Sequence, residues 1–420
     1  MEYKKIVNDD YTLHLIKTDR FKTIKLSLRF TKLYDSSEYS YLKLLERVLP
    51  MNGTKNYKNV NEITKKLENL YNERIVFNSL LNSKNMSFNV NMSIVNPMYT
   101  DKSMYKESFD MLRDILCNPI IKDNSFNNFD LHRDNIINSL MNIKDNPHIY
   151  GSMLFNELFY EGTVYADNNY RHLDEFKSLS NSTLVDVYKK LFNTYKIDVI
   201  VMGDYDEEEI LKNTSMLLKG FKSVNNTSND LYLDIKSKYK IDKEKYESSQ
   251  SDLFVGLTFK DITEFESDYV LVLLNSILGC MNNSILFVNV REKNSLCYHI
   301  GSTINKFTNT LVISSGINKD NFDKTLKLIK SSIESMKNTK VIDGLLDNAK
   351  RTLDIAFNDF YESQFKVMDY YYLREFINVP SIEDRRSNIN NVTSKDIVSL
   401  VNKIEIKEVF LLEGVSDEED

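Results

Sequence analysis

Hydrophobic and polar residues alternate in two distant segments of the chain, residues 23–30 and 252–259. A period of two is typical of a β-strand with one buried face, and both segments end on a phenylalanine. In the same register, each segment is followed by an apolar stripe with the spacing of an amphipathic helix. The stripes consist of Leu44, Leu45, Val48 and Leu49 in the first copy and of Leu273, Leu274, Ile277 and Leu278 in the second.

The likeness between the two halves continues along the chain. Each half then has a strand, a helix and a last strand, which the pattern places at residues 86–95, 109–116 and 197–204 and at residues 310–316, 326–336 and 406–414. Matched elements in one order indicate a duplicated domain rather than a short repeat. The sequence therefore predicts an α+β fold of two homologous domains, residues 1–222 and 248–420, joined by a polar linker at 223–247.

Composition narrows the class of protein. The chain has 420 residues, 54 Lys and Arg against 61 Asp and Glu, and a formal net charge of −7. An aromatic content of 11 % is too high for a chain that stays disordered. Basic residues alternate with acidic ones and form no basic stripe, so nucleic acid is not an expected partner.

Cysteine usage and the N-terminal residues bear on the compartment. Cys117, Cys280 and Cys297 are widely spaced and form no CxxC pair, which argues against a disulfide framework and for a reducing cytosol. The first residues contain no apolar core of a signal peptide, and no apolar run is long enough to cross a bilayer. We expect a cytoplasmic protein without a membrane partner.

Common catalytic motifs are absent from the sequence. No GxGxxG, GxxxxGK[ST] or GxSxG segment occurs, so phosphate loops and a nucleophile elbow have no support. No two histidines have the i, i+4 spacing that places two imidazoles on one helix face for zinc. A lone histidine is usually a surface or core residue; the five here are His14, His132, His148, His172 and His299.

One segment of the second half does combine chemically useful groups. The pattern predicts a helix at 282–293, a turn at 294–295 and a strand at 296–303, with Arg291 near the helix end and Tyr298 on the strand. A guanidinium and a phenol aimed at one point would suit a developing oxyanion. The alternative is structural: Arg291 pairs with Glu292 or Asp252, and Tyr298 packs half-buried on the sheet.

The same segment resembles a known peptidase signature. Residues 290–298, Val-Arg-Glu-Lys-Asn-Ser-Leu-Cys-Tyr, are similar to the second-domain motif of the pitrilysin/insulinase family of inverzincin peptidases. Residues 188–195, the strand running to Gly203 and Asp204, and residues 145–147 also fit this family. The resemblance implies that each domain is a mostly antiparallel sheet covered by helices. It also implies that Arg291 and Tyr298 bind substrate and stabilise the tetrahedral intermediate.

The chain departs from this family at the zinc motif. Where active members carry HxxEH, it has Lys43, Glu46 and Arg47, and two cations in place of the zinc ligands would repel a metal. The helix that supplies the third ligand in the family contains no Glu at 135–140. Glu46 is therefore expected to form ion pairs on a helix surface. Ser295 replaces the usual glycine of the turn, and Asn294 could compensate by adopting a left-handed conformation.

These departures resemble one subunit type of the heterodimeric bacterial branch, which has been associated with elongation factor P modification. In that branch a homologous HxxEH-containing partner holds the zinc, while the other subunit supplies the Arg/Tyr arm. The resemblance implies a heterodimer that processes peptides, with no cofactor or metal bound by this chain and zinc in its partner. A catalytically inactive pseudopeptidase, acting as a scaffold or peptide-binding subunit, is the alternative. A self-sufficient enzyme with another site has no motif in its favour.

Overall fold

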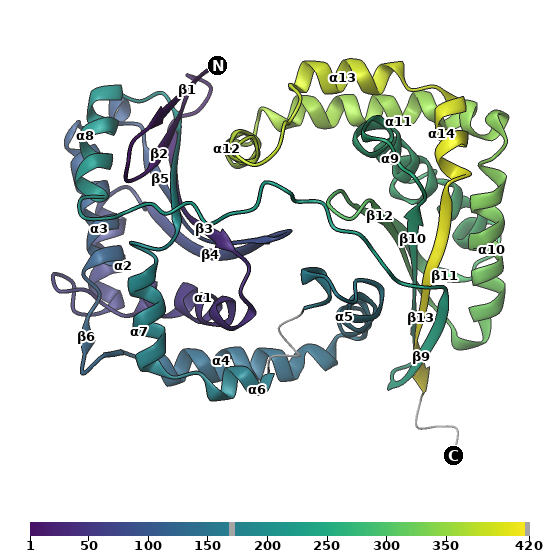
Figure 1. Cartoon of the computed structure of the whole chain (residues 1–420), viewed down its shortest axis with the longest axis horizontal. Coiled ribbons are helices and arrows are strands. Elements are labelled where there is room, and N and C mark those ends of the chain that lie inside the picture. The colour runs from purple at the N-terminus through teal and green to yellow at the C-terminus, as the bar shows by residue number, and fades with distance from the viewer. Residues whose placement is uncertain (168–172, 416–420) are drawn as a thin grey trace. The chain divides into compact units, whose positions relative to one another are not determined.

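The computed structural model describes residues 1–167 and 173–415, and these residues form two compact units. Of the described residues, unit 1 contains 1–141, 173–231 and 363–379; unit 2 contains 142–167, 232–362 and 380–415. Each unit has one large β-sheet with helices packed on it (Figure 1), so the predicted α+β class is confirmed. Neither unit is a continuous stretch of chain, because each one includes a segment from the other half of the sequence. The sequence pattern does not predict this.

Unit 1 is built on a six-stranded sheet with the order β1-β2-β8-β3-β5-β4. All neighbours are antiparallel except β2 and β8, which run parallel. The strands are β1 (Glu2–Val7), β2 (Thr12–Lys17), β3 (Thr23–Leu33), β4 (Arg74–Asn82), β5 (Asn85–Val95) and β8 (Lys196–Gly203), with a separate hairpin of β6 (Ile121–Lys122) and β7 (Ser125–Phe126). The helices are α1 (Ser36–Val48), α2 (Val60–Asn69), α3 (Ser103–Cys117), α4 (Phe129–Met141), α6 (Leu173–Ser178), α7 (Asn181–Lys190), α8 (Glu207–Leu217) and α12 (Gln364–Leu373), with 3₁₀ turns η1 (Leu49–Met51) and η2 (Pro97–Tyr99).

Unit 2 is built on a five-stranded sheet with the order β11-β12-β10-β13-β9. Its strands are β9 (Lys240–Glu247), β10 (Ser251–Phe259), β11 (Cys297–Asn305), β12 (Thr310–Ile317) and β13 (Ile404–Val415). The helices are α5 (Pro147–Phe159), α9 (Leu271–Asn275), α10 (Phe322–Ser335), α11 (Thr339–Phe360), α13 (Ile382–Asn391) and α14 (Ser394–Val401), the π-helical turns are η5 (Glu266–Val270), η6 (Ser276–Cys280) and η7 (Phe287–Glu292), and the 3₁₀ turns are η3 (Asn142–Asp145), η4 (Val164–Ala166) and η8 (Lys319–Asn321).

The two sheets share a topology. The order β4-β5-β3-β8-β2 in unit 1 matches β11-β12-β10-β13-β9 in unit 2, and in both the last pair is the parallel one. Strand β9 therefore occupies the place of β2. It lies inside the stretch 223–247 that we expected to be a linker, so the linker prediction fails for residues 240–247. The charged sequence of β9 hides its strand character, because β9 is an edge strand with mostly exposed side chains.

Each sheet is covered on its second face by a helix from the other half of the sequence. In unit 1, Ile24, Leu26 and the other even-numbered core residues of β3 are fully buried, while Arg29 and Thr31 on the opposite face bond to Asp369 and Tyr372 of α12. In unit 2, α5 packs on β10 and β13 in the same way. The period of two in each strand thus supplies two different contact faces.

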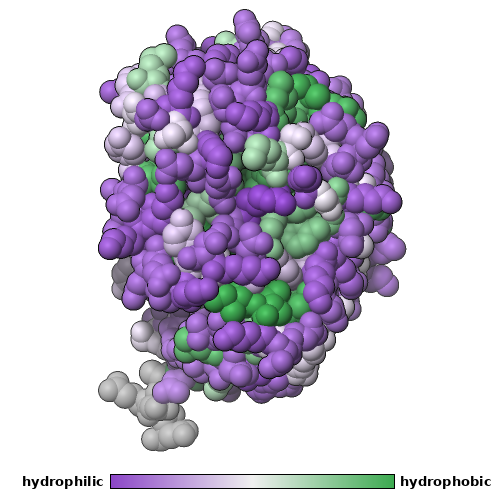
Figure 2. Space-filling view, turned by 90° about the vertical axis from the view of Figure 1, so that its left-hand side faces the viewer, coloured by the Kyte–Doolittle hydropathy of each residue, from purple (hydrophilic) through white to green (hydrophobic). Residues whose placement is uncertain are grey.

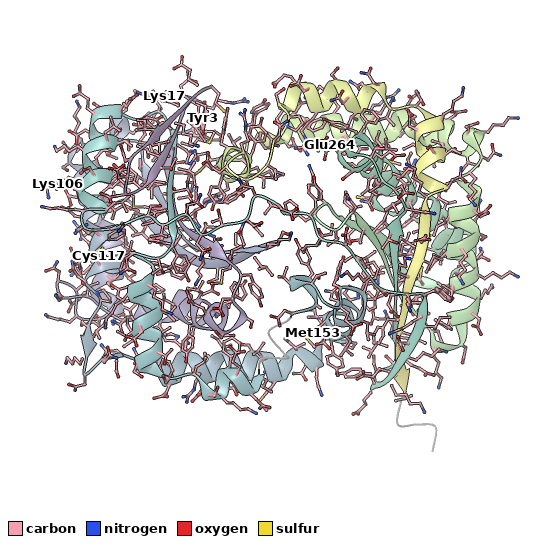
Figure 3. The ribbon with its side chains drawn as sticks, viewed as in Figure 1. Tyr3, Lys17, Lys106, Cys117, Met153 and Glu264 are labelled. Carbon is pink, nitrogen blue, oxygen red and sulfur yellow. The ribbon has the colours of Figure 1, made fainter. Side chains whose placement is uncertain are left out.

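A buried polar network ties the first strands of unit 1 together. The Nε2 atom of His14 lies 3.3 Å from the Asp198 carboxylate, and the Nδ1 atom of the same ring lies 2.9 Å from the Tyr3 hydroxyl. Lys196 also bonds to Asp198. Tyr3 and Lys17 belong to the β1–β2 hairpin that carries this network (Figure 3).

Figure 2 shows that the face of unit 1 carrying α3 and α8 is mainly hydrophilic, with separate small apolar patches. Among residues 1–167 and 173–415, no helix combines the length and the apolar character needed to cross a bilayer.

Candidate functional site

A short turn in unit 2 joins the residues predicted to carry chemistry. Arg291 lies in η7 and Tyr298 on β11, and the backbone amide of Ser295 donates to the Arg291 carbonyl at 2.9 Å. The amide of Leu296 then donates to the Val290 carbonyl at 3.2 Å. Ser295 itself has a φ of 51°, so the left-handed position of the turn is filled by Ser295. The expectation that Asn294 would compensate is wrong.

A β-bulge places Tyr298 outside the regular ladder. Cys297 pairs with Ile317 and His299 pairs with Gly316, which leaves Tyr298 as the extra residue between them. Such bulges redirect a side chain and commonly occur beside functional sites. Tyr298 is 80 % exposed, and its hydroxyl has no hydrogen-bond partner among the described residues. The alternative of a half-buried, sheet-packed tyrosine is therefore wrong.

Arg291 is also presented to solvent. Its guanidinium lies 4.8 Å from the ring centroid of Phe287, and it forms no ion pair within the part of the chain that the structure describes. The alternative pairing with Glu292 or Asp252 is absent there. Arg291 and Tyr298 both line one pocket of about 400 Å³, together with Ser295, Leu296, Cys297, Asn318 and Asn321. A cation and a phenol hydroxyl therefore share an open cavity, with neither engaged by another charged side chain of the described residues.

In unit 1, two of the residues at the HxxEH positions connect helix α1 to the edge strand β4 of the sheet. The Nζ atom of Lys43 donates to the Ser79 carbonyl at 2.9 Å, and the Glu46 carboxylate accepts from the Ser79 amide at 2.6 Å. Lys43 and Glu46 also lie 3.8 Å apart as an i, i+3 ion pair. Glu46 is therefore an ion-pairing residue of the helix that also binds the edge strand β4.

Arg47 and the neighbouring helix complete this region. Arg47 is exposed on α1, and its positive charge interacts electrostatically with His132 of α4. Burial, reinforced by the positive charge of Arg47, lowers the pKa of His132. Residues 135–140 of α4 contain no carboxylate. The residues present do not fit a zinc ion, because a lysine and an arginine occupy the ligand positions and bring positive charge.

Comparisons with known proteins show which proteins this chain resembles. Residues 178–353 match the model of the Peptidase M16 inactive domain. The chain is 23 % identical over 414 residues to "Probable inactive metalloprotease YmfF" of Bacillus subtilis, covering 96 % of each protein. The chain is therefore similar to an M16 inactive domain over residues 178–353 and to a probable inactive metalloprotease over almost its whole length. The resemblance to the pitrilysin/insulinase peptidases is thereby confirmed.

Several solved structures have the same fold as this chain. A conserved protein from Enterococcus faecalis V583 superimposes with a TM-score of 0.91 at 23 % identity, covering 99 % of this chain and 100 % of that one. A peptidase M16 inactive domain from Pseudomonas fluorescens gives a TM-score of 0.77 at 15 % identity, with full coverage of both chains. At these identities the likeness establishes the fold and not the chemistry.

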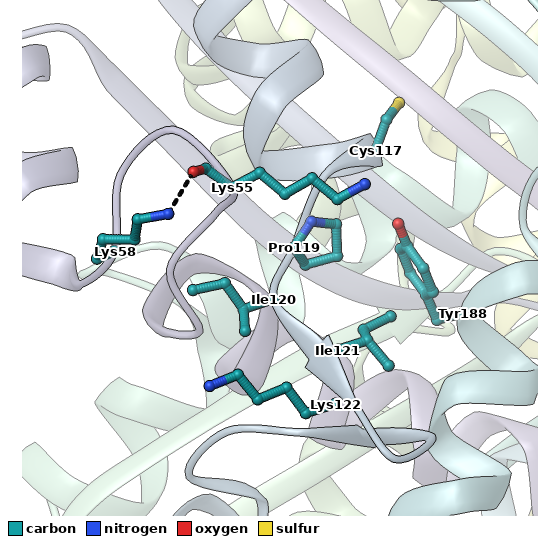
Figure 4. A pocket seen from close by; sticks show the side chains of 8 residues that line it. All are labelled: Lys55, Lys58, Cys117, Pro119, Ile120, Ile121, Lys122 and Tyr188. Carbon is teal, nitrogen blue, oxygen red and sulfur yellow. Dashed lines mark hydrogen bonds between the residues drawn. The ribbon is translucent and has the colours of Figure 1, made fainter.

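Unit 1 has a cavity that is larger than the Arg291/Tyr298 pocket and has a different set of lining residues. It measures about 670 Å³ and is lined by Lys55, Lys58, Cys117, Pro119, Ile120, Ile121, Lys122 and Tyr188 (Figure 4). Burial raises the pKa of the Cys117 thiol to about 11, so this cysteine is a poor nucleophile at neutral pH. None of the predicted site residues lines this cavity.

The fold also brings together three residues that are far apart in the sequence. His148 of α5, Asp252 of β10 and His299 of β11 form one cluster within unit 2, and His148 bonds to Asp252 at 2.9 Å. These residues are too far apart in the sequence for any spacing rule to connect them. His172 lies outside the described residues.

Proposed function

We propose that this M16-like chain is the non-zinc subunit of a heterodimeric peptidase. In this proposal an HxxEH-containing homologous subunit supplies the zinc and the general base. This chain supplies Arg291 and Tyr298, which contact the peptide and stabilise the oxyanion that develops on the scissile carbonyl.

One observation carries the proposal: Arg291 and Tyr298 line the same pocket, and both are exposed without an ion pair or side-chain hydrogen bond within the described ranges. A guanidinium is always charged, and a phenol is a neutral donor at physiological pH. Together they can donate to a negatively charged oxygen without first breaking an internal contact. The bulge at Tyr298 supports this, because it turns the phenol away from its strand neighbours.

The zinc positions of this chain support a division of labour. Lys43 and Glu46 bind the backbone of β4, and Arg47 is a third charged group with no ligand capacity. We infer that this chain contributes no metal to hydrolysis and depends on its partner for it. As a narrower form of the same proposal, the heterodimer acts in connection with elongation factor P modification.

The test begins with capture of the tagged chain from its native cell, scored by mass spectrometry for a similar-length partner that contains HxxEH. The complex is then assayed on a fluorogenic peptide library. We expect Arg291→Ala and Tyr298→Phe each to lower kcat by about 10²- to 10³-fold, the range for removing one oxyanion donor. Assembly of the complex should be unchanged.

Matched controls are available on the same unit. Arg351→Ala and Tyr239→Phe remove an exposed arginine and an exposed tyrosine outside the pocket. They should leave turnover as it is in the wild type. If all four variants cleave peptides equally, Arg291 and Tyr298 have no catalytic role. A stable complex without proteolysis under any metal condition would instead favour the scaffold or peptide-binding pseudopeptidase.

A further inference from the structure

We infer that unit 2 contains a site for a divalent transition metal, with Zn²⁺ as the representative ion, formed by His148, Asp252 and His299. Each of the three residues offers one ligand atom, and these atoms all lie within 4.8 Å of one another. Two imidazoles and a carboxylate are a ligand set that zinc uses when a fourth position is left to water. This inference departs from the expectation that the chain binds no metal.

The sheet of unit 2 sets two of the three ligands side by side. Asp252 on β10 and His299 on β11 both pair with Gly316 of the strand between them. Directly paired residues project from the same face of a sheet, so both side chains rise beside a residue that has none. A Cβ atom at Gly316 would meet His299 Cε1 at 2.9 Å and Gln250 Nε2 at 1.9 Å. The absence of a side chain at Gly316 therefore leaves room for the His299 ring and for the side chain of Gln250.

The third ligand comes from a different element. His148 follows Pro147 at the start of α5, and its Nδ1 atom lies 2.9 Å from the Asp252 carboxylate. The two histidine rings are 5.3 Å apart between centroids and nearly perpendicular, at 85°. With metal–ligand bonds of about 2.1 Å, neighbouring ligand atoms of a tetrahedral site lie about 3.4 Å apart. The histidine–aspartate separation is close to this, and the exposed His299 ring can rotate to complete the set.

Electrostatics at the cluster favour a bound cation. The Asp252 side chain is only 5 % exposed, whereas that of His148 is 46 % exposed, so a largely buried carboxylate lies at the base of an accessible cluster. Burial, His148 and Arg291 lower the pKa of His299 while Asp252 opposes them, which keeps its imidazole neutral and able to ligate. On metal binding, the bond from His148 to Asp252 is replaced by two bonds to the metal, and the ring proton resides on Nε2. Arg291 is a positive charge near His299 that opposes a bound cation.

Zinc binding to the isolated full-length chain tests the site independently of any partner or peptidase activity. The chain is freed of metal with a chelator and titrated with ZnCl₂ by calorimetry, and CoCl₂ serves as a spectroscopic probe of coordination. We expect one Zn²⁺ per chain. His299→Ala and Asp252→Asn should each weaken binding by at least about 100-fold, since even outer contacts of a metal site are worth 10- to 100-fold.

The control is His132→Ala, which removes a histidine of unit 1 and should leave the affinity unchanged. Circular dichroism establishes that each variant is folded, and His148→Ala provides a third ligand variant at a half-exposed position. Absence of saturable Zn²⁺ binding would overturn the inference. So would binding that survives both His148→Ala and His299→Ala, because the metal would then reside elsewhere. Neither result would affect the role proposed for Arg291 and Tyr298.

Discussion

The carboxylate of Glu46 accepts a hydrogen bond from the backbone amide of Ser79 at 2.6 Å, which joins α1 to the edge strand β4. At this position of the HxxEH motif a peptidase would carry its general base. Here the carboxylate is engaged in the fold, and Lys43 binds the carbonyl of the same serine. The two side chains therefore occupy both backbone groups of Ser79 at the free edge of the sheet.

This arrangement predicts a structural role for Glu46. Glu46→Ala should reduce the free energy of unfolding by about 1.5–3 kcal/mol, the range for a hydrogen bond to a charged group. Urea denaturation measures the change. Glu68→Ala, at an exposed glutamate of α2, is the matched control and should stay within about 0.5 kcal/mol of the wild type. Equal stability of the two variants would show that the bond to Ser79 contributes nothing.

Two glycines of unit 2 have different surroundings, so alanine substitutions at them should have opposite effects on stability. A Cβ atom at Gly256 would lie 2.6 Å from the ring of the fully buried Phe159, so Gly256→Ala should cost about 1–3 kcal/mol of stability. Gly344 lies inside α11 with open space around it. There the same substitution should stabilise the protein by about 0.5–1 kcal/mol. Thermal unfolding compares the two, and equal shifts would contradict the steric argument.

Glu73 predicts a pH dependence of stability. Its side chain is buried beneath α3, where the Ser108 hydroxyl donates to it at 2.6 Å, and burial raises the pKa of Glu73 to about 7. The unfolded chain loses this proton near pH 4.5, while the folded chain keeps it until about pH 7. The folded state thus binds more protons in this window, and stability falls as the pH rises through it, by about 3 kcal/mol in total.

Glu73→Gln should remove this contribution. The stability of the wild type relative to the variant is expected to decline between about pH 4.5 and pH 7 and to level off above that range. Denaturation curves at a series of pH values measure the difference. Parallel stability profiles for the two proteins would exclude a shifted Glu73.

Tyr298 predicts a separation of activity from stability. Because its side chain is 80 % exposed and its hydroxyl is unbonded within the described residues, Tyr298→Phe should change the free energy of unfolding by less than about 0.5 kcal/mol. A loss of stability above 1 kcal/mol would indicate a structural role for the phenol. The measurement therefore distinguishes lost chemistry from lost folding in the turnover assay.

The sequence by itself determined the duplicated α+β plan. Strands such as β3 and β10 alternate with a period of two, and helices such as α1 carry an apolar stripe, because local burial dictates both patterns. The pattern predicts an ordinary helix at 282–293 before the Arg/Tyr turn, whereas the structure has a π-helical turn at Phe287–Glu292. Strand β9 was missed, since an exposed edge strand needs no apolar face.

Only the tertiary structure decided which distant residues meet. The bulge that exposes Tyr298 depends on how β11 pairs with β12, and no property of the tyrosine itself encodes that register. His148 reaches Asp252 because α5 packs on the sheet of unit 2, although it lies in the first half of the sequence. Local patterns report which face of an element is buried, but they do not report which partner covers it. The candidate chemistry of this chain depends on those partners.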